Sequence, residues 1–415
     1  MRRSAGADTG IARRAAGAVL VTGILALALN LRTAITSLPP VFPELRQALG
    51  LSGAQITVLA TIPVLCFGVF PVIAAPLSRR FGEERVLGIS LSLVAAGLIL
   101  RGALPGSLLY PGTVLACGAI ALMNVLLPSL IKRRQPSRAG LLIGIYLLSL
   151  AVGSVLGSLL AVPAYRYAAH APWLGGSVRF SLWLWAVPAA IAFALWLPQW
   201  RYRTAPGAGA AALTPRVTVA RHALAWQVTA FMGLQSLSYY ATLSWLPTLL
   251  RDRGATAAHA GELLALMNLG NAVTAMLIPV LAHRMPGQRV LVVPTVLATA
   301  AGIAGALYGP LGSAWAWILL LGLAQGSALG LGIFFAMARA PDPVAAASLS
   351  ALAQGWGYLL ATAGPLAVGL LHASTGGWDV PVALLLVLCA VELAAGWLAA
   401  RGRVLPSPGP PPATG

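Results

Sequence analysis

Long apolar segments constrain what this chain can fold into more than any other feature of its sequence. A helix needs roughly 20 consecutive apolar residues to cross the hydrocarbon layer of a membrane, and segments of that kind follow one another along the chain. Only 9% of the residues are charged, whereas soluble domains carry about 25%. The sequence therefore predicts an all-α membrane protein with twelve transmembrane helices. The segments lie at about 16–38, 54–77, 86–104, 108–131, 139–162, 180–199, 222–250, 258–282, 289–309, 313–337, 345–371 and 379–400.

The basic residues predict how these segments are oriented. Twelve segments place both termini on one side, and 20 of the 27 lysines and arginines fall on that side. Because basic loops are retained in the cytoplasm, we expect a multi-pass protein of the bacterial inner membrane with cytoplasmic termini. The same bias accounts for the net charge of +18 without a nucleic-acid partner. The opposite loops hold Arg46, Arg166, Arg179, Arg251 and Arg253.

Residues that carry enzymatic chemistry form no recognisable constellation. Cys66, Cys117 and Cys389 lie in apolar segments and lack the spacing of a disulfide framework or a metal site. The sequence has no HExxH motif, and its one lysine, Lys132, is not part of a Walker A loop. We therefore expect no metal, no cofactor and no enzymatic activity. A sensor or scaffold would need a folded domain outside the membrane, and the longest loop is a Gly- and Ala-rich linker.

Composition and an internal repeat divide the chain into two halves. The loop "LSRRFGEERVL" at 77–87 resembles "LAHRMPGQRVL" at 281–291, and the two loops hold matching positions in their halves. A parallel repeat of this kind is typical of transporters built from two similar bundles. The predicted organisation is a tail at 1–15, a six-helix bundle at 16–199, a linker at 200–221, a second six-helix bundle at 222–403 and a disordered tail at 404–415.

Several stretches resemble a known family. They are "NLRTAITSLPPVFPELRQALGLS", "PVLCFGVFPVIAAPLSRRFGEERVL", "NVLLPSLIKR" and "ALAQGWGYLLATAGPLAVGLLH". They are similar to the major facilitator superfamily, and within it to the cyanate and 2-nitroimidazole transporter branch, over about residues 12–403. The resemblance implies a monomer in the lipid bilayer, with a central cavity between two bundles and transport by alternating access.

Two substrate classes follow as alternatives. The first is a small anionic or polar planar solute, similar to cyanate or a nitroimidazole. The second is a small amphipathic compound exported by a multidrug-type efflux pump. The direction of transport and the use of protons stay open at this point.

Residues of the repeated loops are candidates for gating. The superfamily usually carries a glycine and an aspartate where this chain has Ala75 and Arg79, and basic residues where it has Glu83 and Glu84. We expect the loop of the first half to contact the neighbouring bundle when the cytoplasmic face is closed. The candidates are Arg79, Arg80, Glu83, Glu84, Arg85, Arg284 and Arg289.

Arg32 is the leading candidate for substrate recognition. It lies in the apolar segment "AGAVLVTGILALALNLRTAIT", and no acidic residue occurs in any of the first six segments. An arginine inside a membrane normally faces protein or a water-filled cavity, and its planar guanidinium offers paired donors to an anion. The alternative is an arginine that snorkels toward the membrane surface. We expect that role for Arg101, at the end of segment 86–104.

Other polar residues are candidates for the lining of the cavity. The stretch "SLPPVFPELR" at 37–46 corresponds to "WLPTLLRDR" at 245–253, straight after the first segment of each half. This correspondence aligns Arg32 with Tyr240, so we expect them to face each other. An interfacial aromatic belt is the alternative for the tyrosines of segment 222–250, and interhelical hydrogen bonding is the alternative for Asn124 and Gln325. The set is completed by Asn30, Thr33, Tyr146, Gln235, Tyr239, Gln354 and Tyr358.

Two acidic residues within segments are candidates for proton coupling. Glu262 is near the end of its segment and Glu392 is deep in the last one. A carboxyl group inside a membrane is a candidate proton carrier, although the last segment is peripheral in the implied fold.

Overall fold

The computed structural model describes residues 4–103, 106–171, 176–200 and 217–406, with backbone alone at 4–19 and 217–218. Most of the predicted linker at 200–221 and of the predicted tail at 404–415 lies outside the described residues. Helices and turns account for the described chain, which confirms the all-α fold in this part of the protein.

The helices of the first half occupy the first six predicted positions. Short 3-10 turns join several of them, and α8 and α9 together form the sixth segment. The helices are α1 (Ser4–Thr36), α2 (Phe42–Leu49), α3 (Gly53–Val69), α4 (Pro71–Phe81), α5 (Glu83–Gly102), α6 (Leu109–Arg134), α7 (Ala139–Ala169), α8 (Ser177–Trp183) and α9 (Ala186–Trp196).

The helices of the second half occupy the other six positions, with α16 and α17 forming one segment. They are α11 (Val217–Ala220), α12 (Ala223–Asp252), α13 (Ala257–Arg284), α14 (Arg289–Tyr308), α15 (Ala314–Ala338), α16 (Pro343–Ala361), α17 (Ala363–Thr375) and α18 (Asp379–Ala399).

Length and hydropathy qualify most of these segments as membrane spans. Ten described segments are long and apolar enough, and the pair α3–α4, bent by 54°, makes an eleventh. The bend falls at Phe70, where Pro71 begins the new helix, because proline has no N–H to continue the hydrogen-bond ladder. The protein is therefore a multi-pass membrane protein, and the count of twelve stays a prediction with which the helices agree.

Helix α12 stands at the seventh predicted position but is not among the candidate spans. Its 30 residues include a run of serine, threonine, glutamine and tyrosine at 235–244. The helix packs mainly against α13 and α15 to α18 of its own half. A helix enclosed by protein on most sides can carry polar residues without exposing them to lipid, so the low hydropathy of α12 follows from its central place.

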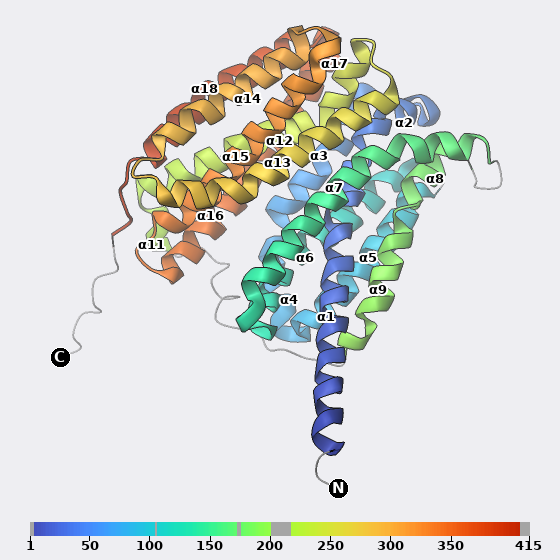
Figure 1. Ribbon diagram of the computed structural model, residues 1–415. Helices are drawn as coiled ribbons and strands as arrows, with labels where there is room; N and C mark the ends of the chain where they lie inside the picture. The colour runs from blue at the N-terminus through green and yellow to red at the C-terminus, as the bar shows by residue number, and fades with distance from the viewer. Residues whose placement is uncertain (1–3, 104–105, 172–175, 201–216, 407–415) are drawn as a thin grey trace.

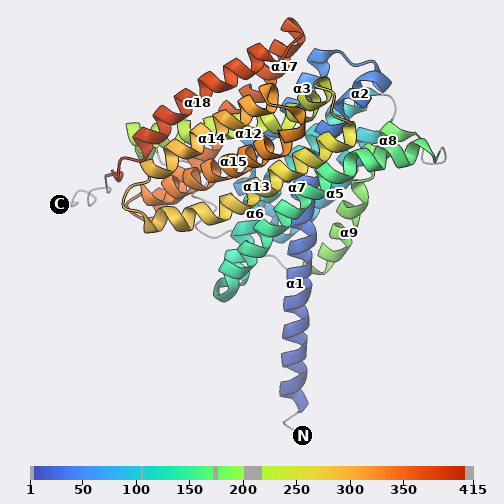
Figure 2. The same ribbon diagram turned by 45° about the horizontal axis from the view of Figure 1, so that its top comes forward.

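Each half is built from its own helix contacts. In the first half α1 packs on α7 and α9, and α5 packs on α6; in the second half α13 packs on α15, and α12 packs on α16 and α18. The halves meet where α7 lies beside α13 (Figures 1 and 2) and where α3 lies beside α16 and α17. The predicted bundle boundaries at 199 and 222 flank the undescribed segment and stay a prediction.

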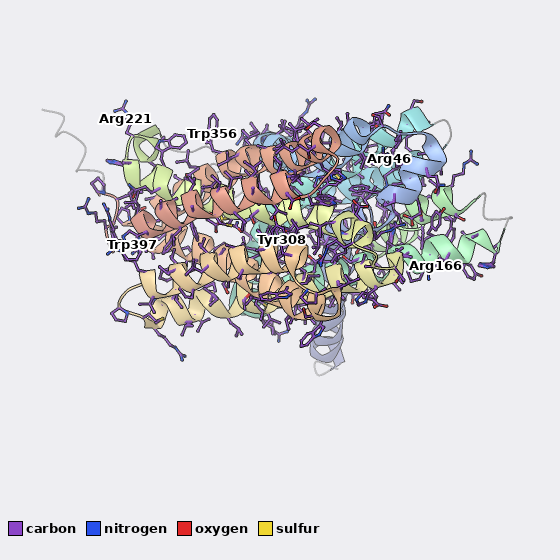
Figure 3. The ribbon with its side chains drawn as sticks, turned by 90° about the horizontal axis from the view of Figure 1, so that it is seen from above. Arg46, Arg166, Arg221, Tyr308, Trp356 and Trp397 are labelled. Atoms are coloured by element: carbon purple, nitrogen blue, oxygen red, sulfur yellow. The ribbon has the colours of Figure 1, made fainter. Side chains whose placement is uncertain are left out.

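Two ends of the molecule can be distinguished by the chain termini. We call the end where α1 begins the N-terminal face and the opposite end the far face. Figure 1 shows the two halves close together at the far face and diverging toward the N-terminal face. In the view from above in Figure 3, Arg46 and Arg166, both predicted for the far side, lie on the right and Arg221 lies on the left.

Contacts between side chains of the two halves hold the far face together. Arg251 at the end of α12 donates to Glu44 of α2 over 2.8 Å. The rings of Phe42 and Trp245 lie 6.2 Å apart between their centroids. One ion pair and one pair of aromatic rings therefore link α2 to α12 on this side.

Candidate substrate site

Arg32 lies at the junction of the two halves. Its Nη1 donates a hydrogen bond of 3.2 Å to the hydroxyl of Tyr240, which is near the middle of α12. Its Cζ lies 5.9 Å from the ring centroid of Phe67 in α3. The side chain is half-buried. The structure thus brings together the two residues that the internal repeat aligns, one from each half.

Aromatic rings surround this contact. The ring of Tyr240 lies 5.1 Å from that of Tyr239, 6.1 Å from that of Phe67 and 6.2 Å from that of Tyr358. Phe67 and Tyr358 are themselves 5.7 Å apart. We call these four residues the aromatic cluster. Because the rings pack inside the protein, the interfacial-belt alternative for the two tyrosines of α12 is wrong.

Tyr146 and Asn124 meet on the first-half side of the site. The hydroxyl of Tyr146 in α7 donates to the Oδ1 atom of Asn124 in α6 over 3.3 Å. Tyr146 is buried and lies within electrostatic range of Arg32, while Asn124 stays half-buried. Both residues therefore border the region around Arg32.

A chain of hydrogen bonds crosses between the halves beside the aromatic cluster. Tyr239 donates to Asn268 Oδ1 of α13 over 3.0 Å, and Asn268 Nδ2 donates to Ser158 Oγ of α7 over 3.2 Å. Sequence reasoning missed Asn268 and Phe67. Asn268 is an amide in an apolar helix that also carries Asn271, so a search for amides in apolar helices, which singled out Asn124, finds it. Phe67 carries no signal, since phenylalanine is an ordinary residue of membrane helices.

The glutamines of α12, α15 and α16 make contacts within the second half. Gln325 Nε2 donates to Thr242 Oγ1 over 2.9 Å, which supports the interhelical alternative for this residue. Gln235 donates to the neighbouring Ser236 over 2.7 Å. Gln354 is exposed and donates to Ser350 one turn away on its own helix. The structure does not bring these three residues to the guanidinium of Arg32.

The neighbours of Arg32 on α1 hold helices together. Asn30 donates to the carbonyl of Pro188 in α9 over 3.2 Å, and Thr33 donates to the carbonyl of Gly153 in α7 over 3.2 Å. Both side chains are buried. They fix α1 between α7 and α9, and their predicted contact with substrate stays a prediction.

Arg101 does not snorkel, contrary to expectation. It is 2% exposed, and its two Nη atoms donate to the carbonyls of Ala34 and Leu182 over 3.0 and 3.3 Å. These carbonyls lie in the last turns of α1 and α8, where backbone oxygens lack helical partners and a positive charge is stabilising. Arg101 therefore caps two helices inside the first half.

The gating candidates make contacts within their own half in this conformation. Glu83 pairs with Arg133, and Glu84 pairs with Arg134 over 3.0 Å, so that α5 is joined to α6. Both carboxylates are fully buried. Their predicted contact with the neighbouring bundle concerns a closed N-terminal face, whereas the halves diverge there, so it stays a prediction.

The other gating candidates lie near the N-terminal face. Arg79, Arg80 and Arg284 are exposed. The guanidinium of Arg289 lies over the ring of Trp397, 4.4 Å from its centroid. Arg85 donates to the carbonyl of Trp200 over 3.4 Å.

The proton-coupling candidates lie away from Arg32. Glu262 is exposed beside His259, with 3.3 Å between the Nδ1 and Oε2 atoms. Glu392 is 1% exposed in α18, and its Oε1 atom has no hydrogen-bond partner among the described residues. Helix α18 packs on α12, α14 and α17, so Glu392 is enclosed in the second half.

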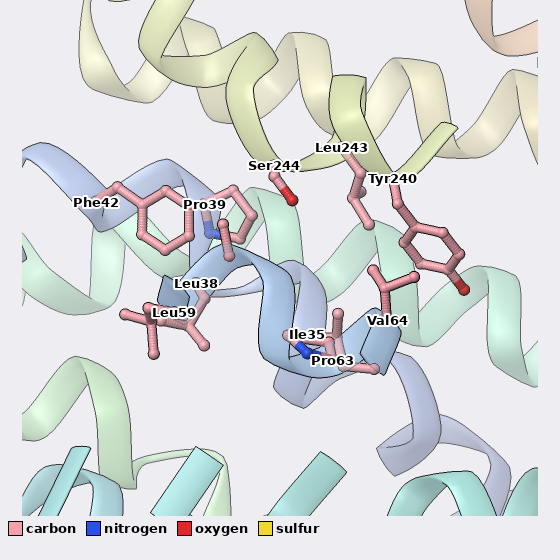
Figure 4. A pocket seen from close by; sticks show the side chains of 11 residues that line it. Ile35, Leu38, Pro39, Phe42, Leu59, Pro63, Val64, Tyr240, Leu243 and Ser244 are labelled. Carbon is pink, nitrogen blue, oxygen red and sulfur yellow. The ribbon is translucent and has the colours of Figure 1, made fainter. Parts of the chain in front are cut away.

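A narrow apolar pocket separates the Arg32–Tyr240 contact from the far face (Figure 4). It lies between the halves and is lined mainly by aliphatic side chains and prolines, with Tyr240 at one end and Phe42 at the other. Ile35, Leu38 and Pro39 contribute from the first half and Leu243 from the second. The apolar side chains that line this pocket form a constriction between the two halves on the far side of the site.

A multi-pass helical protein with a polar and aromatic site between two halves has the layout of a membrane transporter. The sequence profile of the Major Facilitator Superfamily matches residues 23–365, and the chain belongs to this superfamily. This superfamily is a family of transporters and not of enzymes.

Named relatives support the resemblance to one branch. The chain is 39% identical to the 2-nitroimidazole transporter of Escherichia coli K12 over 376 residues, which cover 90% of this chain and 94% of the relative. It is 31% identical to the cyanate transport protein CynX of the same organism, over 86% of this chain and 90% of the relative. Both identities extend over most of the length of each protein.

A solved structure agrees with the fold. A bacterial homologue of the human lysosomal transporter Spinster superposes with a TM-score of 0.78 and 16% identity, covering 94% of this chain and 99% of that one. At this identity the similarity concerns the fold alone.

Proposed function

We propose that this transporter moves a small anionic or strongly hydrogen-bond-accepting planar solute across the inner membrane, with Arg32 as the group that recognises it. The observation that carries the proposal is the position of Arg32. Its guanidinium lies between the two halves, bonds to one hydroxyl, and has no ion pair among the described residues. A substrate held there contacts both halves at once.

The chemistry of the site fits such a solute. A guanidinium is permanently charged and presents several N–H donors in one plane. The single hydrogen bond to Tyr240 leaves other donors available. Flat aromatic faces beside the charge suit a flat ligand. Cyanate and 2-nitroimidazole are the substrates named for two relatives. Cyanate and the nitro group are both small, flat and rich in hydrogen-bond acceptors.

Alternating access is the proposed mechanism. The contacts Glu44–Arg251 and Phe42–Trp245 close the far face, which the positive-inside rule assigns to the periplasm. Opening to that side requires these contacts and the apolar constriction to separate. The halves diverge at the N-terminal face (Figure 1), which supports a conformation directed to the cytoplasm.

The aromatic cluster supports a second candidate function. Four rings packed around one site also suit the efflux of small amphipathic compounds, especially lipophilic cations, through cation–π contacts. A fixed guanidinium beside the rings disfavours a cation, which separates the two candidates.

A thermal-shift titration of the purified protein distinguishes the candidates. Cyanate, 2-nitroimidazole and tetraphenylphosphonium are added to the wild type, to Arg32→Gln and to the control Arg46→Gln, which changes an exposed arginine at the far face. We expect cyanate or 2-nitroimidazole to raise the melting temperature of the wild type and of Arg46→Gln but not of Arg32→Gln. Stabilisation by tetraphenylphosphonium alone would support the efflux alternative and contradict the proposal.

A further inference from the structure

The positive charge of Arg32 has no negative partner among the side chains that the structure describes. It contacts the hydroxyl of Tyr240 and the ring of Phe67, which are neutral. A hydroxyl satisfies one N–H donor and an aromatic face attracts a cation weakly, but neither neutralises the charge. The empty site therefore holds one uncompensated positive charge.

The carboxylates of the described side chains are engaged or enclosed elsewhere. Two of these carboxylates pair with arginines of α6, one pairs with Arg251, and one caps the start of α16. Three others bond to a histidine, a tyrosine or a tryptophan near the far face. The eighth, on α18, is enclosed within the second half. They are Glu83, Glu84, Glu44, Asp342, Glu262, Asp379, Asp252 and Glu392. No described acid is placed to follow Arg32 through a transport cycle.

This charge matters when the carrier changes conformation. Alternating access passes through an occluded state in which the site is closed to water on both sides. Enclosing an unpaired ion carries a large desolvation penalty, and a paired counter-ion offsets much of it. A guanidinium cannot lose its proton to avoid the penalty. The anion-loaded carrier therefore reaches the occluded state more readily than the empty carrier does.

We propose that the protein works as an anion exchanger, in which a bound anion is required for each reorientation of the site. An anion carried in one direction is replaced by an anion carried in the other, and the empty carrier returns slowly. The inference rests on the proposed function, since it assumes that Arg32 binds the anion. It goes further by assigning the mode of transport and by removing the need for a coupled proton.

Flux into liposomes tests the transport mode. The full chain is reconstituted into vesicles loaded either with unlabelled cyanate or with the bulky anion gluconate, and the entry of radiolabelled cyanate is followed. We expect uptake into cyanate-loaded vesicles to be faster by about tenfold or more, the factor that a 1.4 kcal/mol difference in barrier produces. Equal initial rates in both vesicles would overturn the exchange mechanism and leave the proposed function standing, whereas uptake by neither would overturn both.

A conformational measurement provides a second readout that does not depend on flux. Fluorophores attached at Ser137→Cys and His283→Cys, both exposed at the N-terminal face, report the distance between the halves in single molecules. The three native cysteines are buried. We expect added cyanate to raise the rate of opening and closing in the otherwise wild-type protein. Arg32→Gln, which removes the charge, is expected to interconvert rapidly without any anion.

The controls define the outcomes. Arg46→Gln carries the same chemical change at an exposed position and is expected to keep the dependence on cyanate. An Arg32→Gln protein that stays as slow as the empty wild type would overturn the proposal, because the charge would then not be what holds the empty carrier back.

Discussion

Arg32 and Arg101 both lie inside membrane segments of the first half, and their surroundings differ. Arg101 is 2% exposed and gives its Nη donors to carbonyls at the ends of α1 and α8. Arg32 is half-buried and gives one donor to Tyr240, a residue of the other half. The comparison teaches that an arginine in a membrane segment is structural when the backbone takes its donors. It is available to a ligand when its donors face a junction between moving parts.

Stability should separate the two arginines most strongly. Arg101→Ala leaves two buried carbonyls without partners, at a cost of about 1–3 kcal/mol for each such group. We expect a marked fall in the melting temperature of the detergent-purified protein. Arg32→Ala should leave the melting temperature close to that of the wild type, because the change removes an unfavourable charge from the membrane interior. Equal losses in the two variants would show that Arg32 is structural as well.

Binding should separate them in the opposite sense. Removing Arg32 removes charge-assisted hydrogen bonds worth roughly 1.5–3 kcal/mol, so Arg32→Ala should weaken the binding of cyanate by about tenfold to a hundredfold. Calorimetric titration measures the change. Arg32→Lys should also bind weakly, because an ammonium group cannot reproduce the planar fork of donors. Full affinity in the lysine variant would mean that the site recognises charge without geometry.

The smallest expected effect concerns the hydroxyl that Arg32 contacts. Tyr240→Phe keeps the ring of the aromatic cluster and removes the acceptor of the 3.2 Å bond. Since Arg32 is half-buried and can bond to water instead, the loss of stability should stay below about 1 kcal/mol. A chemical-denaturation or thermal scan beside Arg101→Ala gives the comparison. A loss as large as that of Arg101→Ala would contradict the view that Arg32 has donors to spare.

Much of the architecture could be predicted from the sequence, because lipid imposes a simple pattern on helices that cross it. Apolar segments predict the helices, and the correspondence of residues 37–46 with 245–253 predicts the pairing of Arg32 with Tyr240. Helix α12 shows the limit of the first rule. A helix enclosed by other helices does not need apolar residues on every side. The polar run of α12 therefore lowers the hydropathy of its segment in the sequence.

The details of the site depend on which helix ends and faces meet, and this information is not local in the sequence. Arg101 was expected to reach the membrane surface, but the ends of α1 and α8 converge on it. Phe67 joins the aromatic cluster only because α3 packs against α16. The predicted contact of Glu83 and Glu84 with the neighbouring bundle concerns a closed N-terminal face, and the sequence does not show that α6 of the same half presents two arginines to them in this conformation.

Crystals grown with selenocyanate test the central claim most directly, because selenium scatters anomalously and marks the position of a small linear anion. The account predicts an anomalous peak within hydrogen-bonding distance of the Arg32 guanidinium, between α1 and α12, and no peak there in Arg32→Ala. A peak confined to other arginines, such as Arg79 and Arg80 at the N-terminal face, would contradict the assignment of Arg32 as the group that recognises the substrate.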